Sequence, residues 1–166
     1  MTDFNFRPMR RIRQQLPAEE CISILRNATS GTLALLGDGG YPYSLPISFV
    51  YSDGKIFFHS ALRGHKIDAI RNCDKASFSV IEKDDVKPKE YTTYFRSVIC
   101  FGRIHIIESG EDKLKAVKLL GSRYNPNDDE ALSKEIAKSA KAMCMIELDI
   151  EHITGKEAIE LRRMHR

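Results

Sequence analysis

The spacing of apolar residues changes early in the chain, from a helical pattern to the alternating pattern of strands. In the first segment, Cys21, Ile24 and Ala28 recur at the spacing of one helix face. Pro17 stands just before them, where a helix commonly begins. A short amphipathic helix is therefore predicted at residues 17–29.

The following runs are rich in β-branched and aromatic residues and are separated by the turns DGG and SDG. These turns are strong hairpin signals, because glycine accepts the positive φ that tight hairpin turns require. In the longest run, Val98, Cys100 and Ile104 alternate onto one face, and Gly102 between them is typical of a bulge or sharp bend. Strands are predicted at 31–37, 41–51, 54–60, 75–83, 92–108 and 142–156.

The remaining segments are expected to lie around these strands. Six antiparallel strands with peripheral helices indicate an α+β fold, mainly β, built as a small barrel. Helices are predicted at 63–73, 110–124 and 129–141, and an irregular loop at 84–90.

The length and composition indicate one compact unit. With 166 residues, 42% of them apolar, the chain can bury a sizeable core without metals or disulfides. We expect a single domain over 1–166, with its core at about 20–156 and a basic tail at 157–166.

The net charge and the cysteine spacing argue against several classes of protein. A net charge of +3 is too small an excess for a protein that grips nucleic acid, so no nucleic-acid partner is expected. No apolar run approaches the roughly 20 residues of a membrane span. The cysteines are widely spaced, without a C-x-x-C pair or a secretory segment, and are expected to be reduced thiols of a cytoplasmic protein: Cys21, Cys73, Cys100 and Cys144.

The stretch FHSALRGHK, residues 58–66, gathers a hydroxyl, two imidazoles and two longer basic side chains between a predicted strand and a predicted helix. Hydroxyl, ammonium and free backbone N–H groups at a helix start all donate to phosphate oxygens, and the helix dipole adds a favourable potential. The alternative is a polar turn whose charges face water. On spacing alone both interpretations stay open.

Three segments in a fixed order carry a family resemblance. They are YPYSLPISFVYSDGKIFFHSALRGHKIDAI at 41–70, YFRSVICFGRIHII at 94–107 and ELDIEHITGK at 147–156. Together they resemble the pyridoxamine 5′-phosphate oxidase-like, FMN-binding split-barrel superfamily, and within it the nitroimidazole-resistance flavoproteins. The resemblance implies a six-stranded antiparallel split β-barrel that forms a homodimer with FMN at the interface.

The same resemblance assigns cofactor-binding positions. Two basic residues, His65 and Lys66, would clamp the FMN phosphate. The family often has arginine where this chain has His65, so histidine replaces a permanently charged side chain. Ser97 would reach the flavin of the neighbouring subunit, so the strand around Ser97 and Val98 is expected to lie against the partner. The strand beside the isoalloxazine ring would supply Leu45, Pro46, Ile47 and Ser48. The strand end at the phosphate or ribityl chain would supply His59 and Ser60, and the turn after it Leu62.

These roles predict an FMN-dependent oxidoreductase that takes electrons from NAD(P)H and passes them to a small acceptor such as a nitro-aromatic compound. No side chain is predicted as a catalytic residue or as a metal ligand. Two alternatives stay open: a flavin- or haem-binding protein for storage or sensing, with His59 or His105 as the axial haem ligand, and, last, a nucleic-acid-binding barrel. The C-terminal segment ITGKEAIELRRMHR differs from the substrate-gripping segment of true pyridoxamine 5′-phosphate oxidases, which argues against that activity.

Overall fold

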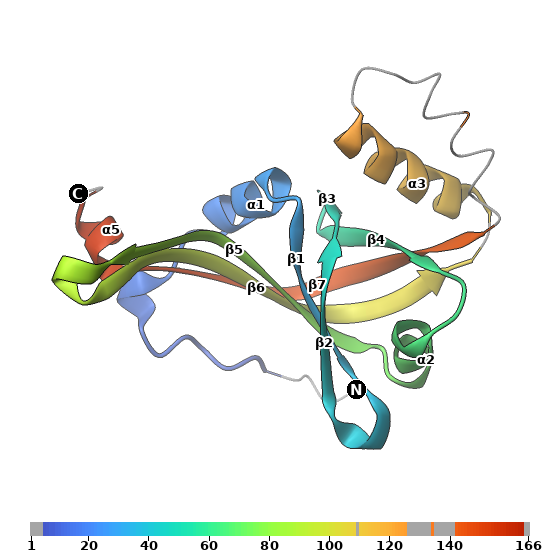
Figure 1. Ribbon diagram of the computed structural model, residues 1–166, viewed down its shortest axis with the longest axis horizontal. Coiled ribbons are helices and arrows are strands. Elements are labelled where there is room, and N and C mark those ends of the chain that lie inside the picture. Colours follow the sequence, from blue (N-terminus) through green and yellow to red (C-terminus); the bar gives the residue numbers. More distant parts are fainter. Residues whose placement is uncertain (1–4, 109, 126–133, 135–141, 165–166) are drawn as a thin grey trace.

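The computed structural model describes residues 5–108, 110–125, 134 and 142–164. Seven strands form one antiparallel sheet in the order β2-β1-β5-β6-β7-β4-β3 (Figure 1). The last strand of the sequence, β7, therefore lies inside the sheet, between β6 and β4. The strands are β1 (Ser30–Leu36), β2 (Pro42–Ser48), β3 (Val50–Ser52), β4 (Lys55–Ala61), β5 (Lys75–Lys87), β6 (Thr92–Ile107) and β7 (Met143–Glu157).

The expected count of six strands is wrong, because the run predicted at 41–51 is split at Phe49. The side chain of Phe49 is fully buried, and the chain on its two sides joins different strands: β2 pairs with β1, whereas β3 pairs with β4. β2 and β3 are the two edges of the sheet, and a single residue links them. They do not pair with each other, so the described sheet is not closed by hydrogen bonds as the expected barrel would be.

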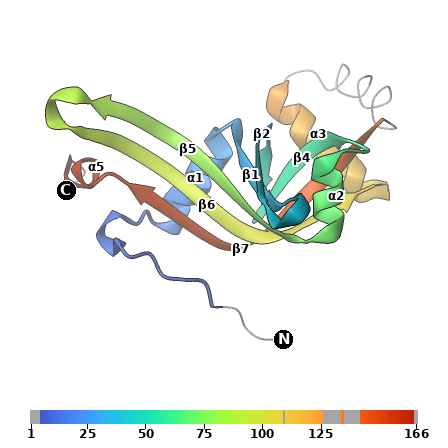
Figure 2. The ribbon, with the colours of Figure 1, turned by 60° about the horizontal axis from the view of Figure 1, so that its bottom comes forward.

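The prediction of an irregular loop at 84–90 is also wrong for most of these residues. β5 continues to Lys87 and pairs with β6, for example Asp85 with Tyr94, before a short 3-10 turn at Pro88–Glu90. This part of the β5–β6 hairpin projects away from α2 and α3 toward α5 (Figures 1 and 2). A hairpin arm with water on much of its surface accepts the polar residues that suggested a loop, because its backbone groups are satisfied by pairing.

The bulge expected at Gly102 is confirmed. The β6–β7 pairing shifts by one residue between Phe101 and Gly102, which leaves Glu151 without a partner across the ladder. A Cβ atom at position 102 would lie 1.8 Å from the carbonyl oxygen of Asp149. Only glycine allows the two strands to approach this closely.

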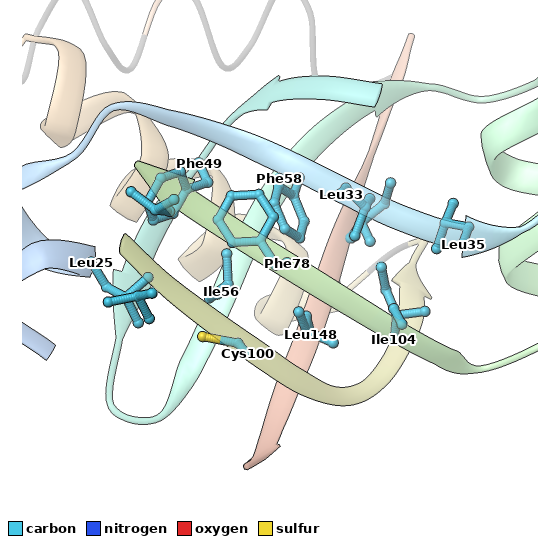
Figure 3. Packing of buried hydrophobic residues seen from close by; sticks show 14 of the residues in the cluster. Leu25, Leu33, Leu35, Phe49, Ile56, Phe58, Phe78, Cys100, Ile104 and Leu148 are labelled. Atoms are coloured by element: carbon cyan, nitrogen blue, oxygen red, sulfur yellow. The ribbon is translucent and has the colours of Figure 1, made fainter. Parts of the chain in front are cut away.

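The core lies on the inner face of the sheet, where Phe49, Phe58 and Phe78 pack edge to face with ring centroids 4.8 and 5.2 Å apart (Figure 3). α1 (Ala18–Asn27), the helix predicted near the N-terminus, covers this core with Cys21, Ile24 and Leu25.

The other described helices are α2 (His65–Asn72), α3 (Gly110–Tyr124) and α5 (Ile159–Met164), with 3-10 turns at Ile12–Gln14 and Asp38–Gly40. The helix predicted at 129–141 lies almost wholly outside the described residues. None of the described helices is long and apolar enough to span a bilayer.

The cysteines carry free thiols, as expected, and three of the four are buried. Burial raises the pKa of the Cys100 thiol to about 12, so this thiol is inert at neutral pH.

Candidate functional site

A cavity of about 550 Å³ lies where β2, the end of β4 and the start of α2 meet. Its volume is within the range of small-molecule and cofactor sites. Of the ten cofactor-binding residues predicted from the sequence, eight line this cavity, although they come from two separate segments of the chain. They are Leu45, Pro46, Ile47, Ser48, His59, Ser60, His65 and Lys66.

The β2 side of the cavity offers backbone polar groups. β2 is an edge strand whose only ladder is with β1, so its other edge is unpaired among the described residues. Pro46 fits such a position, since an edge strand tolerates a residue without an N–H. The backbone groups of this free edge can therefore donate hydrogen bonds to the polar rim of a planar ligand and accept hydrogen bonds from it.

The opposite side is formed by the N-terminus of α2. Gly64 caps this helix with φ of +126°, a conformation that favours glycine, and its carbonyl accepts the N–H of Ile67 at 2.8 Å. The N–H groups of His65 and Lys66 come before this bond and find no backbone acceptor among the described residues. They are donors of the kind that bind anions at a helix start.

Lys66 brings a half-buried positive charge to the same place. Burial lowers the pKa of its ammonium group below the usual value, and no described carboxylate forms an ion pair with it. A positive charge that is partly desolvated and unpaired is stabilised by any anion that enters the cavity.

β2 and the turn before it hold His65 in position. Its imidazole stacks on the ring of Tyr43 with centroids 4.1 Å apart, and its Nε2 lies 3.7 Å from Oδ2 of Asp38. The two residues predicted to bind the phosphate thus differ in their surroundings. Lys66 is half-buried, whereas His65 is more exposed and is oriented by an aromatic ring.

Two predicted positions do not line the cavity. Leu62 lies in the turn before α2 with 44% of its surface exposed, and Ser97 lies on β6, paired with Ile81 and Lys156. The strand around Ser97 and Val98 was expected to lie against a partner subunit. Val98 itself is fully buried in the core of its own chain, so only the opposite face of β6, which carries Ser97, is available for such a contact.

The cavity also has lining residues that the sequence analysis did not assign. Tyr43 shares the face of Leu45 and Ile47, and the alternation of β2 could have identified it. Arg63 adds a third basic side chain, and its place inside the stretch 58–66 was a usable signal. The unassigned lining residues are Tyr43, Ala61, Arg63 and Gly64.

The chain thus has a mainly-β α+β fold, with one unclosed antiparallel sheet and a cavity between an edge strand and a helix start. The pyridoxamine 5′-phosphate oxidase family model matches residues 17–157, and the chain therefore belongs to this family. The resemblance seen in the sequence is confirmed at this level. No curated protein matches the chain.

Solved structures share the fold. An FAD-binding protein from Mesorhizobium loti is 25% identical, with a TM-score of 0.60 over 87% of this chain and 97% of that one. A candidate 5-nitroimidazole antibiotic resistance protein from Bacteroides thetaiotaomicron is 19% identical, with a TM-score of 0.69 over 86% and 85% of the two chains. An FAD- and haem-binding protein from Mycobacterium smegmatis is 22% identical, with a TM-score of 0.73 over 88% and 73%.

Proposed function

We propose that this chain binds FMN in the cavity between β2 and α2 and acts as an NAD(P)H-dependent oxidoreductase on a small acceptor such as a nitro-aromatic compound. One observation carries the proposal. Eight residues assigned to a flavin site, from the stretches 45–48 and 59–66, line the same cavity, which also contains the ammonium group of Lys66, with no described carboxylate paired to it. Membership of the family and the flavin-binding neighbours in the fold support it.

The donors in the cavity favour a flavin that ends in a phosphate monoester. Arg63, His65 and Lys66 line one end, together with the free N–H groups of the α2 N-terminus. A terminal phosphate carries up to two negative charges and three acceptor oxygens, which matches this group of donors. The solved relatives that bind FAD share the fold, but this cluster of cations is better suited to the monoester of FMN.

The chain's own part in the reaction is binding, orientation and electrostatics. A bound FMN supplies the two-electron chemistry that links reduced nicotinamide to the acceptor. The edge of β2 would position the ring through backbone groups, and His59 and Ser60 would hold the ribityl chain or the phosphate. No side-chain acid or nucleophile is needed for this role.

A second copy of the chain would complete the site. Ile81 and Ile99 are exposed on the outer face of β5 and β6, and Phe101 beside them is partly covered by Phe6. Ser97 lies on the same face of β6 as Ile99, because residues two apart in a strand point the same way. A homodimer that buries this face would direct Ser97 toward the partner, consistent with the role the family resemblance gives it.

Membership of the family does not by itself assign pyridoxamine 5′-phosphate as the substrate. α5 carries arginines that could in principle bind a substrate phosphate. Arg162, however, already forms an ion pair with Glu157, in which Nη1 lies 3.5 Å from Oε1. The chain has no tryptophan, and this segment differs from the substrate grip of the true oxidases. We therefore propose negligible oxidation of pyridoxamine 5′-phosphate.

Absorption and stopped-flow measurements test the function. The purified protein should show flavin bands, be reduced by NADH or NADPH, and be reoxidised faster by a nitro-aromatic compound or a quinone than by buffer alone. A Soret band would instead identify a haem protein. Flavin bands without reduction by either nucleotide would contradict the oxidoreductase, and rapid formation of pyridoxal phosphate would contradict the exclusion of that substrate.

A further inference from the structure

A second site of a different kind lies on the outer face of the sheet, away from the proposed flavin cavity. We propose that His105, Glu147 and Asp149 bind a divalent transition-metal ion of the zinc class. His105 and Glu147 line a cavity of about 790 Å³ between the sheet and α3, and Asp149 stands beside them outside its lining. This cavity shares no lining residue with the flavin cavity.

The strand register brings the three groups together. His105 of β6 is directly paired with Glu147 of β7, and Asp149 follows two residues later on the same face. The Nε2 atom of His105 lies 3.6 Å from Oε1 of Glu147, and its Nδ1 atom lies 3.9 Å from Oδ2 of Asp149. One ligand atom from each residue can be chosen so that all three lie within 4.8 Å of one another.

A metal ion would bind only one nitrogen of the His105 imidazole, so the relevant span is the 4.8 Å within which one atom from each residue fits. With bonds of about 2.0–2.2 Å to nitrogen and oxygen, ligand atoms around zinc are roughly 3–3.5 Å apart. Side-chain rotations would bring the three ligand atoms together around the ion. The backbone of both strands is fixed in the ladder next to the Gly102 bulge, so the site rests on regular elements rather than on loops.

The charge of the cavity favours a cation. Four carboxylates and two lysines line it: Asp53, Glu108, Asp112 and Glu147 against Lys55 and Lys115. Glu108 is also paired with Arg71, whose Nη2 lies 2.9 Å from Oε1, which leaves a smaller excess of negative charge. Lys115 is already engaged along α3, where its Nζ lies 3.6 Å from Oδ1 of Asp112. One imidazole with two carboxylates suits zinc and its first-row neighbours, whereas magnesium and calcium prefer oxygen ligands alone.

Lys55 occupies the position of the cation in this structure. Its Nζ lies 2.5 Å from Oε1 of Glu147 and 3.2 Å from Oδ1 of Asp149, which places it on two of the proposed ligands. The Lys55 side chain is 43% exposed, so it can move into water when a metal binds. The lysine therefore competes with the metal. Its removal should strengthen metal binding because the nearly buried Glu147 loses the ammonium group that lies on it.

The test is titration of the purified protein with Zn²⁺ by calorimetry and with Co²⁺ by visible absorption. We expect one equivalent to bind, with the intense d–d bands of a low-coordinate Co²⁺ site, and no competition from Mg²⁺. His105→Ala and Asp149→Asn should each weaken binding about tenfold or more. Lys55→Met should strengthen it several-fold.

His152→Ala is the matched control, since it removes another histidine from the outer face of the same two strands. It should leave Zn²⁺ affinity within about twofold of the parent protein, and so should Lys66→Met, which separates this site from the flavin proposal. Equal losses in the His105 and His152 variants would overturn the site as adventitious surface binding. Unchanged or weaker binding in Lys55→Met would overturn the assignment of Lys55 as the competitor and of its two carboxylates as ligands.

Discussion

Lys66 is the side chain on which the proposed cofactor site depends most. Its ammonium group is half-buried, burial lowers its pKa, and no described carboxylate forms an ion pair with it. The folded protein without a ligand therefore carries an electrostatic cost at this position, which a bound phosphate would offset.

Replacement of Lys66 by methionine should weaken FMN binding by at least about tenfold while riboflavin affinity changes little, because only FMN presents a phosphate. Fluorescence titration of the apoprotein with each flavin measures both affinities. Equal losses for the two flavins would show that Lys66 does not address the phosphate.

The stability of the same variant without flavin is the control for folding, and it has a defined pH dependence. Since the folded-state pKa of Lys66 is lower than its usual 10.5, the cost is fully present below that lowered pKa and disappears as pH rises toward 10.5. Lys66→Met should therefore be as stable as the parent protein, or more stable, at pH 7 in urea unfolding. Any advantage should shrink at pH 10; a variant clearly less stable at pH 7 would contradict the unpaired charge.

For single site residues, the sequence predicted the contacts between residues that are close together along the chain. The stretch 58–66 placed His59, Ser60, His65 and Lys66 in one site because a strand end, a turn and a helix start bring them together. It could not reveal that His105 stands beside Glu147, since that contact depends on the register between two strands some forty residues apart.

Among the elements, the β6–β7 ladder shows most directly how one residue type sets a structure. Gly102 lies where the register shifts, and its missing side chain leaves room for the backbone of Asp149. Gly64 is different: its φ is +126°, but a Cβ atom there would meet nothing within 4 Å. The first glycine is required for space and the second for conformation.

Gly102→Ala should destabilise the protein by about 2–3 kcal/mol, because overpacking a close backbone contact forces the strands apart. Gly64→Ala is the comparison: it should cost about 1–3 kcal/mol from backbone strain alone, because its φ of +126° and ψ of 169° are essentially restricted to glycine. Urea unfolding of both variants measures the two costs. A Gly102→Ala variant as stable as the parent protein would contradict the close contact.

Periodicity predicted most of these elements, including the bulge, and failed on the β5–β6 arm. Residues 84–90 have few apolar positions because the arm packs only on a small cluster of Tyr94, Ala158 and Leu161. At its tip, Tyr91 is 97% exposed with a left-handed φ of +51°. Pairing between neighbouring strands stabilises this segment. Backbone pairing of this kind does not require alternating apolar residues, so the hydrophobic pattern scarcely indicates it.

At the level of the whole molecule, the pattern indicated antiparallel strands but not how the sheet ends. The split at Phe49 sends a continuous β-like run to opposite edges of the sheet, and a buried aromatic residue inside such a run looks like any other strand residue. The proposed assembly of two chains likewise rests on the family resemblance and not on the hydrophobic pattern.

Ile99→Glu should lower the dimer content and the flavin occupancy together, because it places a charge on the outer face that the proposed partner would cover. Leu114→Glu on α3 is a matched control, since Leu114 and Ile99 are 43% and 42% exposed. Sedimentation velocity with flavin absorbance measures both quantities. A fully flavin-loaded monomer would contradict the composite site.

The central place of β7 has a consequence for how the protein is made. Strands synthesised before it can form only two separate ladders, β2-β1-β5-β6 and β4-β3, joined through Phe49. Until residues 143–157 leave the ribosome, β6 and β4 each present an open edge to other nascent chains. Translation that pauses before this strand would leave a growing chain with exposed strand edges, dependent on chaperones until its last strand is inserted.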